Sequence, residues 1–296
     1  MRQSGCANGA APSARDPRED SSRACRRAYP PVVGLLVLLC LSLGLPACGT
    51  LSTGRGWGEG AIYPVQWARI GEAALHAAFD LQTLIPAAGA VVVGTVDHWD
   101  RKVSDWATTH HPLFGSGDAA RSAADAGLYF LDAEAFGTAL ATPSDDDPTE
   151  WGLWKAKGVG VELTAELATA GMTSVLKDAT NRPRPSGTGQ SFPSGHASGA
   201  FSSATLANLN WNSLAVPSAV RLPAQISNVL LATGVGWARV EADAHYPSDV
   251  LAGAALGYFL SAFIHDAFMG LPPDNKFQFY VLPSKHGATV GVSLGF

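Results

Sequence analysis

The sequence predicts an all-α fold, a compact helical bundle, followed by a short C-terminal β-hairpin. Apolar positions recur at helical spacing, alanine is abundant between turn-forming segments, and helices do not alternate with strands. With 47% apolar and 15% charged residues, the chain is too hydrophobic for a disordered protein. A net charge of −5 without a basic stripe argues against nucleic-acid binding. A buried globular protein and a membrane-associated protein both remain open.

Residues 1–47 have the organisation of a secretory signal peptide. Arginines precede an uncharged stretch, residues 31–45, which is shorter than the about 20 residues that span a bilayer. The stretch ends in Leu-Pro-Ala-Cys at residues 45–48, which resembles a bacterial lipobox. That resemblance implies cleavage before a lipidated Cys48; an ordinary signal peptide or a short anchor helix is the alternative.

The cysteines all belong to this N-terminal part of the chain, at Cys6, Cys25, Cys40 and Cys48. After cleavage only Cys48 would remain. The mature chain could then form no intramolecular disulfide and no thiolate metal site.

Residues 48–60 form a Gly-rich segment that we expect to act as a tether, and residues 61–270 should form the helical domain. Helices are expected over residues 64–80, 81–97, 119–141, 150–178, 195–209, 223–239 and 247–268. The most apolar stretch of these segments, residues 250–264, is fifteen residues long. Buried helices are therefore favoured over membrane spans, with an integral membrane protein as the alternative.

The tail, residues 271–296, has strand composition. Residues 277–281 and 290–296 are rich in aromatic and β-branched residues, and the second stretch alternates strictly. A β-hairpin packed on the bundle is expected. The alternative, the last strand of an outer-membrane barrel, fails because two strands cannot close a barrel.

The first of three segments that carry chemistry runs from Lys177 to Pro185. Lys177 ends a helix, and two prolines force the following residues into an extended loop. The ammonium of Lys177 and the guanidinium of Arg184 can converge on one anion. Taken alone, such basic residues often only interact with the dipole of a helix C-terminus.

The second segment, residues 191–196, opens a helix. Ser194 is placed as an N-cap, and Gly195 leaves room for an anion near the free N–H groups of the first turn. His196 beside such an anion can serve as a general acid. A purely structural cap is the alternative.

The third segment contains Arg239, His245 and Asp249. Pro247 suits a first helical turn, which places His245 at the helix mouth and Asp249 within the turn. The carboxylate can accept a hydrogen bond from one imidazole nitrogen and leave the other as a nucleophile. Arg239 supplies a bidentate anion contact. An isolated pair of this spacing is just as often structural.

Together the segments read Lys, six residues, Arg-Pro; Pro-Ser-Gly-His; and Arg, five residues, His, three residues, Asp. This pattern, over residues 177–249, resembles the type 2 phosphatidic acid phosphatase superfamily. That superfamily includes class A bacterial acid phosphatases and vanadium-dependent haloperoxidases. The helices expected over residues 64–268 are consistent with the superfamily's helical bundle.

The resemblance implies a role for each matching residue. His245 would attack phosphorus and form a phosphohistidine, while Asp249 orients it. His196 would protonate the leaving alkoxide and then activate water. The phosphate oxygens would be held by three cations and the N–H groups of a helix start, at Lys177, Arg184, Arg239, Ser194 and Gly195. Positioning and charge neutralisation of this kind require no metal and no other cofactor.

Two residues and one segment do not fit the superfamily pattern directly. Ala238 stands where the superfamily commonly has Ser, which removes one possible contact to phosphate. Arg182 lies outside the six-residue spacing and would only lend positive potential at the mouth. Residues 97–116 are expected to form a loop that packs normally, covers the pocket with Trp99 and Trp106, or holds a metal through its His and Asp residues.

We therefore expect a metal-independent phosphatase of the bacterial envelope, a lipoprotein that faces the periplasm, with the outer membrane as its expected location. It would cleave a phosphate monoester or pyrophosphate of a lipid or small molecule, and residues 246–253 favour the lipid phosphatases. A vanadium-dependent haloperoxidase is an alternative because vanadate mimics the pentacoordinate phosphate. A non-catalytic lipoprotein is the other. The expected partners are the phosphorylated substrate and, through Cys48, the membrane.

Overall fold

The computed structural model describes residues 49–61, 67–270, 277–284 and 287–294. All of them belong to one compact unit of the chain, Leu45–Phe296. The predicted signal peptide, residues 1–47, and Cys48 lie outside the described residues. The predictions made for them are therefore not tested by the structure.

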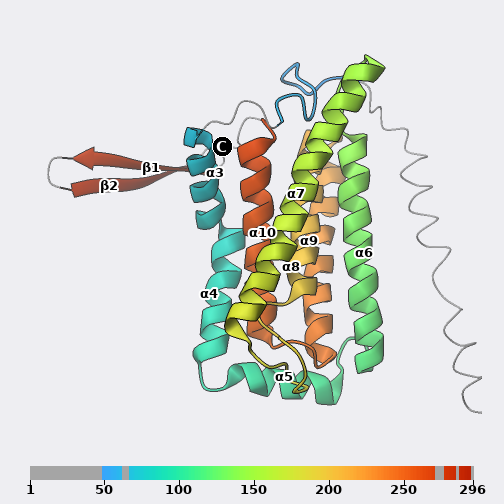
Figure 1. Cartoon of the computed structure of the whole chain (residues 1–296), viewed down its shortest axis with the longest axis vertical. Coiled ribbons are helices and arrows are strands. Elements are labelled where there is room, and N and C mark those ends of the chain that lie inside the picture. The colour runs from blue at the N-terminus through green and yellow to red at the C-terminus, as the bar shows by residue number, and fades with distance from the viewer. Residues whose placement is uncertain (1–48, 62–66, 271–276, 285–286, 295–296) are drawn as a thin grey trace, which may run out of the picture. The chain divides into compact units, whose positions relative to one another are not determined.

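Helices dominate the described residues, so the prediction of an all-α bundle is confirmed (Figure 1). The helices are α3 (Trp67–Phe79), α4 (Leu81–Thr95), α5 (Trp99–His110), α6 (Gly117–Ala141), α7 (Pro148–Thr180), α8 (Gly195–Ser213), α9 (Ser218–Glu241) and α10 (Pro247–Phe268). Strands β1 (Phe277–Ser284) and β2 (Gly287–Leu294) pair antiparallel, with Phe277 opposite Leu294.

Several helices begin where a side chain accepts a hydrogen bond from the first turn. Asp80 accepts from the N–H of Gln82 at 2.7 Å, and Asp147 accepts from that of Thr149 at 2.8 Å. These caps satisfy N–H groups that have no partner within the helix. α9 begins at Ser218, five residues before the expected start, because Pro223 is tolerated within its second turn.

Residues 97–116 do not form the expected loop, because α5 occupies Trp99–His110. The buried face of α5 consists of small and polar residues, Asp100, Ser104 and Ala107. Trp99, Val103 and Trp106 do recur at helical spacing, but the buried face itself carries no large apolar residue. α5 lies across the end of the bundle, beside the loop that connects α7 and α8 (Figure 1).

α10 is the central helix and contacts α8, α4, α3 and α7. Small residues allow α8 to approach it closely. A Cβ at Gly253 would lie 2.6 Å from the carbonyl oxygen of Ser194, and one at Gly257 would lie 2.2 Å from that of Ser198. The close parallel packing brings the N-termini of α8 and α10 to one end of the bundle, where the N–H of Ser194 donates to the carbonyl of Asp249 at 2.9 Å.

The Gly-rich segment expected to be a tether packs against the opposite end of the bundle. Trp57 is fully buried in a core cluster with Ile264 and Met269. A Cβ at Gly158 would lie 2.3 Å from the Trp57 ring, so glycine is required there. The burial of one large aromatic side chain explains why this segment is part of the folded domain.

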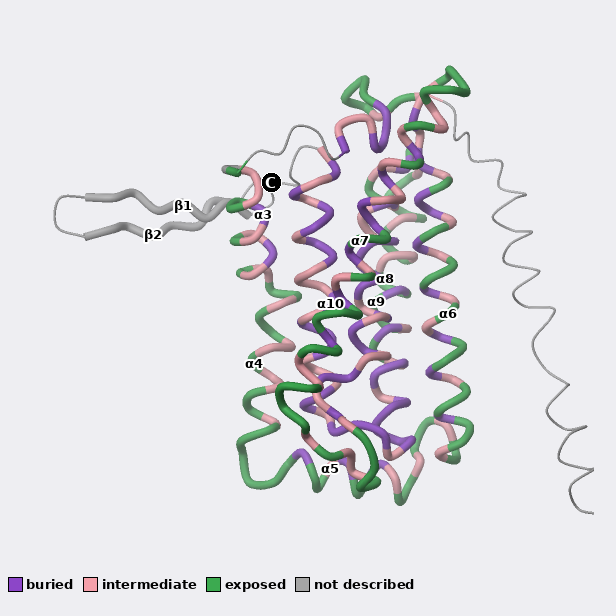
Figure 2. The backbone as a smooth tube through the Cα atoms, viewed as in Figure 1, coloured by how far each residue is buried: buried purple, intermediate pink, exposed green. Residues whose placement is uncertain are grey.

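The outer surface of the bundle is unusually apolar. α4 has no buried residue, and its Leu84, Ile85 and Val91 are exposed (Figure 2). Within the described residues, α10 is the one helix long and apolar enough to cross a membrane alone, and half of that stretch is buried. α3 and α4 meet the same criterion together, as a pair bent by 51°.

Candidate active site

The loop between α7 and α8 brings the first two sequence segments together. It folds back on itself, so that the N–H of Ser191 donates to the carbonyl of Arg182 at 2.8 Å. Gly187 and Gly189 adopt φ values of 84° and 82°, a region that favours glycine. As a result, the carbonyl groups of Gln190 and Ser191 face the cations and His245.

His245 is buried just before α10, and its orientation is fixed by the backbone. Its Nδ1 lies 2.7 Å from the carbonyl oxygen of Ser191. A carbonyl can only accept, so Nδ1 carries the proton and Nε2 keeps its lone pair. Burial lowers the pKa of His245, and the positive charges of Lys177 and Arg239 lower it further, while Asp249 opposes them. The neutral imidazole that a nucleophile requires is therefore favoured.

Asp249 does not accept the hydrogen bond from His245 that the sequence led us to expect. Its Oδ2 lies 3.8 Å from Nδ1 of His245, beyond hydrogen-bond distance. Oδ2 instead accepts from the N–H of Tyr246 at 2.8 Å, and Oδ1 accepts from Arg182 at 2.7 Å. The carboxylate caps its own helix and acts on the imidazole through its negative charge.

Arg182 is held between two carboxylates and does not belong to the phosphate-binding set. Its Nη2 donates to Asp100 at 2.6 Å, opposite the bond from its Nη1 to Asp249. Its guanidinium carbon also lies 4.3 Å from the centre of the Tyr246 ring. Two anionic partners neutralise the charge of Arg182, so the positive potential expected from it is reduced.

Asp100, which the sequence analysis did not assign to the site, connects α5 to the start of α10. Its Oδ1 accepts from the N–H of Ser248 at 2.8 Å, and its Oδ2 accepts from the Ser248 hydroxyl. The carboxylate thus caps α10 from another helix. We call Asp100, Arg182, Ser248 and Asp249 the clamp. No local pattern predicts Asp100, because its partners are far along the chain.

Lys177, Arg184 and Arg239 lie close enough to repel one another, and we call these three residues the phosphate cradle; that they bind phosphate remains a prediction from the sequence. Lys177 Nζ and Arg184 Nε both donate to the carbonyl of Gln190, at 3.2 and 3.3 Å. Nε of the buried Arg239 has no hydrogen-bond partner among the described residues. Burial lowers the pKa of Lys177 and of Arg239, and repulsion from Arg184 lowers both further. A bound anion would relieve that repulsion.

The start of α8 adds N–H donors to the cradle. Ser194 is buried and caps the helix, accepting from the N–H of Ala197 at 3.4 Å. A Cβ at Gly195 would meet only Thr173, at 3.8 Å, so packing does not require glycine there. The open space lies at the positive end of the helix dipole, where anions bind favourably.

His196 is more open than His245 and has a carboxylate partner. Its Nε2 lies 2.7 Å from Oδ1 of Asp125 on α6, with side chains 30% and 51% exposed. Burial lowers the pKa of His196, and Arg239 lowers it further, while Asp125 raises it. The sequence does not predict Asp125, because it precedes His196 by 71 residues and belongs to no motif.

The remaining candidates do not join the site. Ala238 is buried in an apolar cluster with Ala200 and Ala204. Trp99 and Trp106 are about half exposed on α5. No group of three or more His, Cys, Asp or Glu residues in the described part of the chain is arranged to hold a metal ion. The metal site considered for residues 97–116 is therefore not supported.

Comparison with known proteins finds similarity in the part of the chain that carries the phosphate cradle and both histidines. Residues 160–273 match the model of the PAP2 superfamily. An 89-residue stretch is 38% identical to the lipid A 1-phosphatase of Porphyromonas gingivalis, covering 29% of this chain and 18% of that protein. The chain thus spans under a fifth of the length of that relative.

A solved structure also resembles the chain. It is the transmembrane PAP2-type phosphatidylglycerolphosphate phosphatase from Bacillus subtilis, with a TM-score of 0.46 and 22% sequence identity. The alignment covers 66% of this chain and 94% of that one.

Proposed function

We propose that the chain is a phosphatase that hydrolyses lipid phosphate monoesters through a phosphohistidine, and the match of residues 160–273 to the PAP2 superfamily model supports this proposal. One observation carries the proposal. The hydrogen bond from His245 to Ser191 leaves Nε2 unprotonated in a site that three cations and a helix N-terminus make attractive to phosphate. Such a site supplies the positioning and charge neutralisation that phosphoryl transfer needs.

In the first step, Nε2 of His245 attacks phosphorus in line, and the bond from phosphorus to the ester oxygen breaks. Protonated His196 gives its proton to the leaving alkoxide, so that an alcohol departs. The cradle neutralises the charge on the three equatorial oxygens. The Asp249 carboxylate, 3.8 Å from Nδ1, stabilises the positive charge that His245 gains.

In the second step, neutral His196 takes a proton from water as the water oxygen attacks the phosphohistidine. The bond from Nε2 to phosphorus breaks, inorganic phosphate leaves, and His245 returns to its neutral form. Because Nε2 of His196 contacts Asp125, Nδ1 is the nitrogen left for these transfers. The Asp125 carboxylate favours the protonated ring with which the cycle begins and ends.

The test is hydrolysis of a chromogenic phosphomonoester and of phosphatidic acid by purified protein in the presence of a chelator. Turnover by the wild-type chain that is lost in His245→Ala and His196→Ala supports the proposal. Turnover that survives in His245→Ala contradicts the mechanism. Absence of turnover together with halide oxidation after vanadate addition would identify the haloperoxidase alternative. Absence of both activities would favour a non-catalytic protein.

A lipid substrate is favoured by the surface of the bundle and by the relatives. Their names describe phosphatases of lipid A and of phosphatidylglycerolphosphate. Exposed apolar side chains on several helices are typical of a surface that contacts lipid. They include Leu84, Ile85, Val91, Leu163, Leu167, Val175, Ile226 and Leu230.

We further propose that the chain is a lipoprotein of the bacterial envelope, lipidated at Cys48. Fatty-acid labelling that is lost in Cys48→Ala would support the anchor, and labelling unaffected by the substitution would contradict it. Alkaline extraction of membranes separates two modes of attachment. Release of the Cys48→Ala protein indicates that the lipid alone holds it, whereas retention indicates that the apolar helix surface does.

A further inference from the structure

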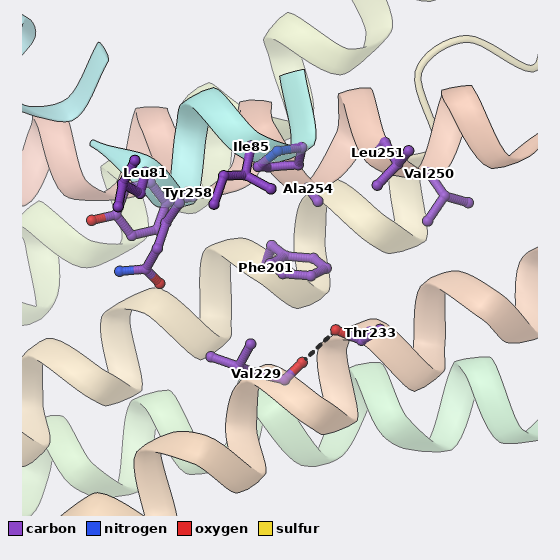
Figure 3. Close-up of a pocket in the computed structure, with 11 residues that line it drawn as sticks. Leu81, Ile85, Phe201, Val229, Thr233, Val250, Leu251, Ala254 and Tyr258 are labelled. Atoms are coloured by element: carbon purple, nitrogen blue, oxygen red, sulfur yellow. Dashed lines mark hydrogen bonds between the residues drawn. The ribbon is translucent and has the colours of Figure 1, made fainter. Parts of the chain in front are cut away.

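An apolar groove runs along the side of the bundle between α4, α8, α9 and α10. Its volume is about 290 Å³. Phe201 of α8 lies in its middle, with Val250 and Leu251 toward one end and Leu81 and Tyr258 toward the other (Figure 3). The proposed mechanism makes no use of this groove.

The groove offers little to a polar ligand. None of its eleven lining residues is charged. The hydroxyl of Thr233 donates to the carbonyl of Val229 in its own helix, at 2.8 Å, and is thereby satisfied (Figure 3). Ile85 and Val229 are exposed at its edges. Burial of this surface against hydrocarbon would be favourable.

The groove begins next to the catalytic site. Val250 and Leu251 directly follow Asp249 of the clamp at the start of α10. From Val250 to Tyr258 the groove follows α10 for two turns, which is about 12 Å at the rise of an α-helix. One end thus lies at the end of α10 that the clamp holds, and the other lies along the apolar flank of the bundle.

We propose that this groove binds one acyl chain of the lipid whose phosphate occupies the cradle. The proposal rests on the proposed phosphatase function and names the part of the substrate that the side of the bundle recognises. The charge pattern complements a single amphiphile, since the cations Lys177, Arg184 and Arg239 stand at one end and an uncharged channel leads away from it. An extended hydrocarbon chain fits the volume.

Thr233→Phe tests the groove from its exposed edge, where the added ring fills space without disturbing the core. Its matched control is Thr164→Phe, because Thr164 is also exposed and donates to the carbonyl one turn earlier, at 2.7 Å. The measurement is the ratio of kcat/KM for dipalmitoyl phosphatidic acid to kcat/KM for the chromogenic phosphomonoester. Thr233→Phe should lower this ratio about tenfold or more, because burial of even about two methylene groups contributes that factor. Thr164→Phe should leave it unchanged, and equal ratios in both variants would overturn the proposal.

A second measurement does not depend on turnover. Phosphatidic acid with a photoreactive group on one acyl chain is cross-linked to the full chain, and the labelled peptides are identified. Labels on residues 81–86 and 250–258 support the groove, even if the protein hydrolyses nothing and the proposed phosphatase function fails. Labels only elsewhere overturn it, as does a separate bifunctional cross-linker that joins residues 81–86 to a second copy of the chain.

Discussion

The N-termini of α10 and α8 each present a histidine to the same cradle, but they hold it in different ways. His245 is buried, bonded to a backbone carbonyl, and next to a helix start that the clamp fixes. His196 is 30% exposed and bonded to a carboxylate that is itself half exposed. The difference corresponds to their proposed tasks. A nucleophile benefits from a fixed tautomer and position, whereas a proton donor must exchange protons with solvent.

The largest expected effect comes from replacing the two histidines separately. His245→Asn should lower kcat on the order of 10⁴-fold or more, because it removes the nucleophile. His196→Asn should lower it about 10²–10⁴-fold, as expected for loss of a general acid. Rapid quenching should trap a phosphoenzyme in His196→Asn with a good leaving group and none in His245→Asn. A phosphoenzyme in His245→Asn would refute the assignment.

The next effect tests whether the clamp fixes the start of α10. Arg182→Gln should lower the free energy of unfolding by about 1–3 kcal/mol, because it leaves Asp100 without its charged partner. Displacement of His245 should also lower kcat by about tenfold or more and leave KM nearly unchanged.

Two controls test whether these effects belong to the clamp: a substitution elsewhere on α5, and the double substitution of the Arg182–Asp100 pair. Lys102→Gln on α5 removes an ion pair with Asp97, which precedes the helix, and the two side chains are 60% and 71% exposed. The substitution should therefore change stability by less than about 1 kcal/mol. The Arg182→Gln and Asp100→Asn substitutions should be non-additive when combined. Additive losses, or a kcat that does not change, would show that the clamp does not position His245.

A smaller effect should distinguish the roles of the two histidines in the pH dependence of kcat/KM. Asp125 raises the pKa of His196, so Asp125→Asn should lower it. Because His196 acts in its protonated form, the limb of the kcat/KM profile that reports its deprotonation should move to lower pH. Asp125 is not among the groups that shift the pKa of His245, so the other limb should stay in place. Movement of both limbs, or of neither, would contradict separate roles.

The smallest effect is expected at Ala238. Its apolar surroundings and its position within α9 would direct a new hydroxyl toward the helix's own backbone. Ala238→Ser should therefore change the inhibition constant for inorganic phosphate, a competitive inhibitor, by less than about threefold. Tighter inhibition by a factor of ten or more would mean that the position faces the cradle after all.

The sequence was most informative where function depends on residues close together in the chain. The fixed spacings predicted that Lys177, Arg184, Arg239 and His245 belong to one site, and the structure places them near one another. Helical periodicity predicted most helices. α5 was missed because small and polar residues form its buried face.

The sequence by itself therefore determined the chemistry of the site: its cations, its two histidines and the helix starts that carry them. Only the tertiary structure decided which partners hold them, namely the Ser191 carbonyl for His245, Asp125 for His196, and Asp100 for the start of α10. Capping and spacing follow from a few neighbouring residues. Contacts across 54 to 148 residues depend on how the helices pack, and in this chain glycines of α10 set that packing.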